Sequence, residues 1–69
     1  MPQAVSAAIR EFEYWPDKSE LYVQFATGRK YVYFDVPAAA YRGFCNAGSF
    51  GEYFNCYIRD HYDFRELPS

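Results

Sequence analysis

The sequence predicts a small α+β domain, a three-stranded antiparallel β-meander followed by two helices packed on one face, in the order β-β-β-α-α. In the first half, three short runs alternate apolar and polar residues, which is typical of half-buried strands. In the second half, apolar residues recur at helical spacing behind two helix-start signals. The 69 residues leave room for a single domain over 1–69, in which we expect residues 1–5 and 65–69 to be loosely ordered.

The first predicted strand is AIREFEYW, and the PDKS segment that follows has the composition of a turn. Phe12 and Tyr14 alternate with glutamates, so the two rings share one face of the strand. Ile9 is out of phase with these rings. This mismatch indicates a bend or β-bulge near Arg10.

The next two runs, ELYVQFA and YVYFDV, predict a β-hairpin whose register depends on its turn. A two-residue turn at Thr27 and Gly28 would pair Tyr31 with Gln24, but a β-branched threonine resists the positive φ that this turn needs. A type I turn with Gly28 as a left-handed bulge residue is more compatible and pairs Val23 with Tyr31. This register places one set of side chains on the same face of the sheet: Leu21, Val23, Phe25, Tyr31 and Tyr33. The opposite face then carries Tyr22, Val32 and Phe34.

The PAAAYRGFCNA segment predicts the first helix, because the fixed φ of Pro37 suits a helix start. Gly43 weakens a helix by about 1 kcal/mol relative to alanine, which indicates a close packing partner at this position. Gly48 has the place of a left-handed residue that ends the helix. The apolar face of this helix consists of Ala40, Tyr41, Phe44 and Ala47.

Ser49 and Glu52 form a capping-box pattern, which predicts that a second helix runs from Phe50 to about Tyr62. Asn55 and Arg59 share a polar face of this helix. Its apolar stripe is predicted to contain Phe50, Phe54, Tyr57, Ile58 and His61.

Aromatic residues make up 23% of the chain, with eight tyrosines and seven phenylalanines. Each large ring can bury roughly 150–250 Å², so we interpret these rings mainly as core. The net charge is −2, whereas nucleic-acid-binding proteins usually carry a basic excess. A role in RNA binding would therefore need the scattered cations to converge on one face: Arg29, Lys30, Arg42 and Arg59.

The cysteines and the histidine do not indicate catalysis or metal binding. Cys45 and Cys56 lack metal-site spacing, and we interpret them as small, buried or half-buried hydrophobic residues of a reduced protein. A bridge between them is the less favoured alternative. Cys56 and His61 would point in different directions from one helix, which disfavours a thiol enzyme. Because the sequence also lacks a signal peptide and a long apolar span, we expect a cytoplasmic, non-enzymatic protein with no cofactor, no small-molecule substrate and no membrane association.

Several residues, spread over nearly the whole chain, follow a specific order: Leu21-x-Val23-x-Phe25, Gly28-x-x-Tyr31-x-Tyr33-x-x-Val36-Pro37, Tyr41, Phe44, Ala47-x-Ser49-x-Gly51 and Phe54-Asn55-x-x-Ile58-Arg59. This order resembles the KTSC domain, a short bacterial and phage module named for its occurrence at the C-terminus of some lysyl-tRNA synthetases. The resemblance implies a stand-alone binding module and, through the synthetase association, contact with RNA or tRNA. The family's motif positions on this chain are Tyr31, Tyr33, Ser49, Gly51, Asn55 and Arg59.

Two kinds of binding stay open at this point. The first is RNA or tRNA binding, through Arg59, Asn55, Arg42, Tyr31 and Tyr33. The second is contact with another protein or with a second copy of the chain. That contact would use the opposite face of the sheet, at Tyr22, Val32 and Phe34.

Overall fold

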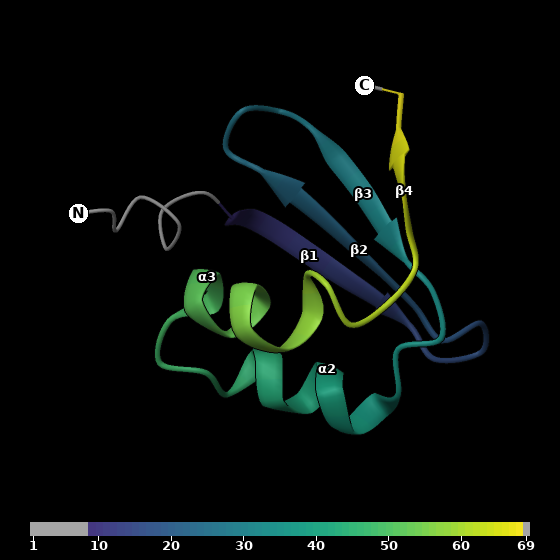
Figure 1. The fold of residues 1–69 in the computed structure, drawn as a ribbon, viewed down its shortest axis with the longest axis vertical. Helices are drawn as coiled ribbons and strands as arrows, with labels where there is room; N and C mark the ends of the chain where they lie inside the picture. The colour runs from purple at the N-terminus through teal and green to yellow at the C-terminus, as the bar shows by residue number, and fades with distance from the viewer. Residues whose placement is uncertain (1–8, 69) are drawn as a thin grey trace.

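The computed structural model describes residues 9–68 and shows a sheet with helices packed across one of its faces (Figure 1). The elements in chain order are β1 (Ile9–Trp15), β2 (Glu20–Phe25), β3 (Lys30–Tyr33), α2 (Ala38–Cys45), α3 (Phe50–Tyr53), the π-helix η1 (Phe54–Ile58) and β4 (Phe64–Leu67). The strands pair antiparallel in the order β1-β2-β3-β4. The α+β class is therefore confirmed, although the sheet has four strands where three were predicted.

The predicted strand registers are confirmed. Val23 pairs with Tyr31, and Gly28 has a φ of +97°, as the bulged turn requires. The register between β1 and β2 shifts between Ile9 and Glu11, where the sequence indicated a bulge. Turn chemistry thus determined which face each tyrosine of the hairpin occupies.

The fourth strand was not predicted, and the expectation of a loose tail is wrong for residues 65–67. β4 pairs with β3, with Phe64 opposite Tyr33. An unpaired β3 would expose a row of backbone N–H and C=O groups at the sheet edge, and the returning tail satisfies them. The ring of Phe64 also packs 5.5 Å from that of Tyr33. The other expected loose segment, 1–5, lies outside the described residues.

The first helix begins as predicted but ends differently. Pro37 is the N-cap of α2, and Asn46 is its C-cap. Gly48 is not a left-handed cap, because Gly28 is the glycine with positive φ among residues 9–68. The helix closes its last turn through backbone bonds from Asn46, so it needs no left-handed residue.

Gly43 has the close packing partner that its helix position indicated. A Cβ atom at Gly43 would collide with the Tyr53 side chain, and the Tyr53 hydroxyl donates to the carbonyl of Ala40 at 3.2 Å. This contact brings α3 against α2.

The second helix starts at the predicted cap, where the Ser49 Oγ accepts from the Glu52 amide at 3.3 Å. It then widens into the π-helix η1 and ends at Ile58, short of the predicted end at Tyr62. The Arg59 amide donates to the Phe54 carbonyl at 2.8 Å, an i→i+5 bond that places more residues in the turn.

The wider turn corrects the predicted apolar stripe. Phe54 and Ile58 are buried, but Phe50 and Tyr57 are 42% and 59% exposed and His61 is also exposed. Helical spacing of 3.6 residues no longer applies across a π-turn. The core that results joins the sheet to α2 and η1, and Tyr53 of α3 packs against it. Its buried residues are Leu21, Val23, Tyr33, Val36, Phe44, Phe54 and Ile58.

Candidate functional site

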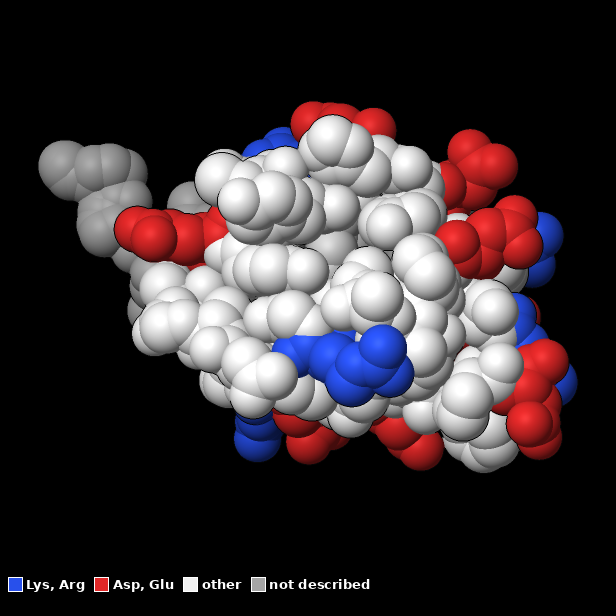
Figure 2. Space-filling model, turned by 90° about the horizontal axis from the view of Figure 1, so that it is seen from below, with Lys and Arg blue, Asp and Glu red and all other residues white. Residues whose placement is uncertain are grey.

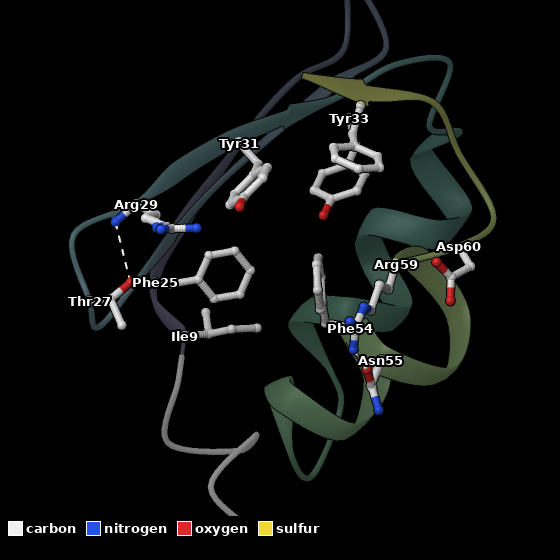
Figure 3. Close-up of a pocket in the computed structure, with 11 residues that line it drawn as sticks. Ile9, Phe25, Thr27, Arg29, Tyr31, Tyr33, Phe54, Asn55, Arg59 and Asp60 are labelled. Atoms are coloured by element: carbon white, nitrogen blue, oxygen red, sulfur yellow. Dashed lines mark hydrogen bonds between the residues drawn. The ribbon is translucent and has the colours of Figure 1, made fainter. Parts of the chain in front are cut away.

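A cleft of about 490 Å³ lies between the helix-covered face of the sheet and η1, near the β2–β3 turn (Figure 3). In Figure 3 the rings of Tyr31 and Tyr33 point from β3 into this cleft. Asn55, Arg59 and Asp60 lie on the facing wall, on and just after η1. The full lining consists of Ile9, Phe25, Thr27, Arg29, Tyr31, Tyr33, Phe54, Asn55, Arg59, Asp60 and Phe64.

The aromatic wall of the cleft is held in place by ring-to-ring contacts. Phe25 packs edge-on against Tyr31 at 5.5 Å and against Phe54 at 5.4 Å. Phe64 packs 5.8 Å from Tyr31, and its side chain is 54% exposed. Such edge-to-face and tilted pairs are favourable geometries for aromatic rings. The cleft therefore presents an apolar surface on which the Phe64 ring is the most exposed.

Two guanidinium groups lie on different sides of this surface. Arg59 donates to the Asn55 Oδ1 at 3.0 Å, which orients its side chain beside η1. Arg29 lies 3.9 Å from Glu66, and a hydrogen bond with Tyr31, followed by the Glu66 charge, raises the pKa of Arg29 above its ordinary value. Both groups are thus positioned by neighbours in the fold.

Tyr33 is the titratable residue of the cleft whose ionisation is most affected by the fold. Burial, then the proximity of Tyr31, raises the pKa of Tyr33 from 10 to about 12. The folded state therefore holds this proton more tightly than the unfolded chain. The resulting stabilisation is complete below about pH 10 and is lost as the pH rises through about 12.

We expect Tyr33→Phe to flatten the alkaline part of the stability profile. Between about pH 10 and 12 the wild type should lose on the order of 2 kcal/mol through Tyr33, and the variant should not, because phenylalanine has no phenol to ionise. Urea unfolding followed by circular dichroism across this range measures the effect. Tyr57→Phe, which changes a 59% exposed ring, is the matched control. If both variants flatten the profile equally, the effect of burial is contradicted.

Four of the five residues predicted for RNA binding come together in the cleft: Tyr31, Tyr33, Asn55 and Arg59. Arg42 does not, since it lies on α2 outside the lining. The four cations do not all gather on one face, which was the condition set for RNA binding. Lys30 lines a hollow on the opposite face of the sheet, whereas Arg29 and Arg59 share the cleft. Figure 2 shows the face that carries α2, where cations are scattered rather than gathered in a basic patch.

Two lining residues that complete the cleft were not among the predicted binding residues, although Arg29 was named as one of the cations. Phe64 belongs to the tail that was expected to be loose, and Arg29 follows the hairpin turn without any motif of its own. The register of the hairpin was the one available signal for Arg29, because it places the residue one position before β3.

The opposite face of the sheet is less apolar than predicted. Val32 is only 4% exposed, so it offers little contact surface, and Tyr22 and Phe34 are half-buried. The Tyr22 hydroxyl donates to the Glu20 Oε1 at 2.9 Å, and this bond is the main cause that raises the pKa of Tyr22. Val32 pairs with Tyr22 on one side and with Arg65 on the other.

The thiols and the histidine show no shared arrangement. Cys45 and Cys56 are free and exposed, which corrects the expectation that they are buried or half-buried. The His61 Nε2 lies 2.9 Å from the Cys56 carbonyl oxygen, a backbone contact. Residues 9–68 contain no group of three histidines, cysteines or carboxylates that could hold a metal ion. Within the same residues, no helix is long and apolar enough to cross a membrane.

Comparison with known proteins identifies the family. The family model of the KTSC domain matches residues 5–62, which is most of the chain. The chain belongs to the KTSC domain family. The chain is 32% identical in sequence to a KTSC domain protein from Yersinia pestis, and the two structures superpose with a TM-score of 0.85. The match covers 90% of this chain and 87% of that one.

A lysine–tRNA ligase from Nostoc punctiforme also contains a similar segment. It is 33% identical to this KTSC domain over 61 residues, which cover 88% of this chain. The same segment covers 11% of the ligase, so this KTSC domain corresponds to about a tenth of that enzyme's length.

Proposed function

We propose that this KTSC domain is a non-enzymatic, cytoplasmic module that binds single-stranded RNA, with tRNA as the leading candidate. The observation that carries the proposal is the cleft, whose lining combines an accessible aromatic ring with two positioned guanidinium groups. The similarity to part of a lysine–tRNA ligase supports tRNA as the RNA to test first.

The size and lining of the cleft fit one unpaired nucleotide. A volume of about 490 Å³ is in the range of small-ligand sites. Stacking of a base on an aromatic side chain contributes about 1–3 kcal/mol and tolerates any base. Phe64, with 54% of its side chain exposed, is the ring available for such stacking. Recognition would therefore depend on an unpaired base rather than on a particular sequence.

The charges of the cleft point to weak binding. Arg29 and Arg59 can each contact one phosphate, but Glu66 lies 3.9 Å from Arg29 and Asp60 lines the same cleft as Arg59. For single strands, log K falls by about 0.7 per neutralised phosphate for each tenfold rise in salt. Two contacts predict a slope of roughly −1.4, much smaller than that of a basic RNA-binding protein.

We expect Arg59→Gln to weaken binding about tenfold, because it removes one charge-assisted contact to phosphate. The experiment titrates labelled protein with tRNA and with an unpaired oligonucleotide at low salt, following amide chemical shifts. Arg42→Gln is the matched control, since Arg42 lies on α2 outside the cleft.

Phe64→Leu tests the stacking part separately and should also weaken binding, with less change in the salt slope. Two outcomes contradict the proposal. One is the absence of shift changes around the cleft at low salt. The other is an Arg42→Gln variant that weakens binding as much as Arg59→Gln does.

A further inference from the structure

The face of the sheet that is turned away from the helices carries a row of side chains crossing all four strands. Glu13 pairs with Tyr22, Tyr22 with Val32, and Val32 with Arg65. Paired residues in adjacent strands point to the same side of a sheet. From β1 to β4, the row thus consists of an acidic, an aromatic, an aliphatic and a basic side chain. We call this set the outer row.

The residues around the outer row show a similar, less complete division of charge. On the β1 and β2 side lie Glu11 and Glu20 together with one cation, Lys18, and on the β3 side lies Lys30. These residues line a hollow of about 640 Å³ together with Trp15, whose side chain is 47% exposed. Glu13 and Arg65 are both exposed, and the ion pair found within residues 9–68 involves other residues. Their charges are therefore available to a partner.

We propose that two copies of this chain associate through this face, about a twofold axis parallel to the strands. This rotation reverses the strand order, so that β1 of one copy lies over β4 of the other. Glu13 then faces Arg65 of the second copy. Tyr22 lies over Val32, which is largely buried, so the contact surface comes from the exposed charged residues and from Tyr22. Because a twofold interface is isologous, each contact occurs twice. Aligned packing of two twisted sheets has this arrangement of strand directions.

The charge division favours a second copy over other occupants. An RNA would meet the phosphate repulsion of Glu11, Glu13 and Glu20, and a basic peptide would meet Lys30 and Arg65. A second copy, related by the twofold axis, places its basic side over the acidic side of the first copy and its acidic side over the basic side. The RNA cleft lies on the helix-covered side, so this association is independent of RNA binding.

The extent of the face predicts a weak dimer. Four strands spaced about 4.8 Å apart, each with about five residues rising 3.3 Å, cover roughly 20 by 17 Å. This is less than the roughly 800 Å² per partner of a standard interface. The dimer should therefore be reversible and should weaken as salt screens the exposed charges.

A charge-exchange experiment tests the pairing. In sedimentation experiments at low salt, we expect the wild type to form a dimer as its concentration rises. Glu13→Arg or Arg65→Glu alone should raise the dissociation constant of this dimer at least tenfold. Each variant alone places like charges opposite each other. An equimolar mixture of the two variants should associate again. In a dimer of one variant with the other, positions 13 and 65 that face each other carry opposite charges. Arg42→Glu, on α2, is the matched control and should not change association.

Positions 13 and 65 are exposed, so both variants should fold, and their circular dichroism should match that of the wild type. A wild-type protein that remains monomeric up to millimolar concentration overturns the proposal. So does a dimer that neither reversal affects, or a mixture of variants that remains monomeric.

Discussion

Phe44→Ala is expected to lose about 3–5 kcal/mol of unfolding free energy, the largest effect of any variant considered for this KTSC domain. Phe44 is fully buried, and its ring stacks on Phe12 at 4.1 Å and on Tyr53 at 5.8 Å. It therefore joins β1, α2 and α3 in one cluster. A domain of this size buries only about 60% of the surface of its unfolded chain, and its total stability is small. The variant should be largely unfolded at moderate temperature.

Urea unfolding followed by circular dichroism measures this loss. Tyr57→Ala is the control, because it also removes a ring from the helical layer, but one that is 59% exposed. Its ring packs 4.7 Å from that of Tyr53, so a loss of about 1 kcal/mol is expected. Equal losses for the two variants would show that burial in this cluster is not what stabilises the domain.

Gly43→Ala is expected to destabilise the domain by about 1–3 kcal/mol, which is the opposite of what helix propensity predicts. In an isolated helix, alanine would gain about 1 kcal/mol over glycine. In the folded protein a Cβ atom would lie 2.9 Å from Cζ of Tyr53. That ring cannot easily move, since it packs against Phe44 and Tyr57 and its hydroxyl bonds to Ala40.

A double-mutant cycle separates the two effects. In a Tyr53→Leu background the shorter side chain leaves room beside position 43. There we expect Gly43→Ala to be neutral or to stabilise by up to about 1 kcal/mol, as propensity alone predicts. Thermal unfolding of the four proteins gives the coupling energy. The same destabilisation in both backgrounds would contradict a steric role for the Tyr53 ring.

Local sequence signals predicted the hairpin and the helix starts. Gly28 determined the register of β2 and β3 because it adopts the positive φ that Thr27 resists. Ser49 marked the start of α3 because its hydroxyl accepts from an amide three residues on. Both signals act over a few neighbouring residues, so they can be recognised without knowing the rest of the fold.

The end of the second helix was predicted less well, because it does not depend on neighbouring residues alone. The π-turn at η1 changes the phase of the helix, and the alternation of apolar residues does not reveal it. Burial of Phe54 and Ile58 against the sheet then replaces the predicted stripe, and Tyr57 is left exposed. Tertiary packing thus overrode the regular helical period.

The sequence did not predict the cleft, but it named four of its lining residues. Tyr31, Tyr33, Asn55 and Arg59 were among the predicted binding residues, and the structure brings these four together. Arg42 was grouped with them only because it is a cation, and it lies elsewhere. Whether cations converge depends on how helices pack on the sheet, which their spacing in the chain does not record.

The amino-acid sequence was therefore sufficient for the α+β class, the hairpin register and the helix starts, because each depends on φ preferences, capping bonds or alternation among near neighbours. The tertiary structure was needed for the fourth strand, the packing partner of Gly43 and the composition of the cleft. In each of these cases the outcome depends on contacts between distant residues. The free edge of β3 pairs with β4, and Phe64 completes the aromatic wall, only once the chain has returned to the sheet.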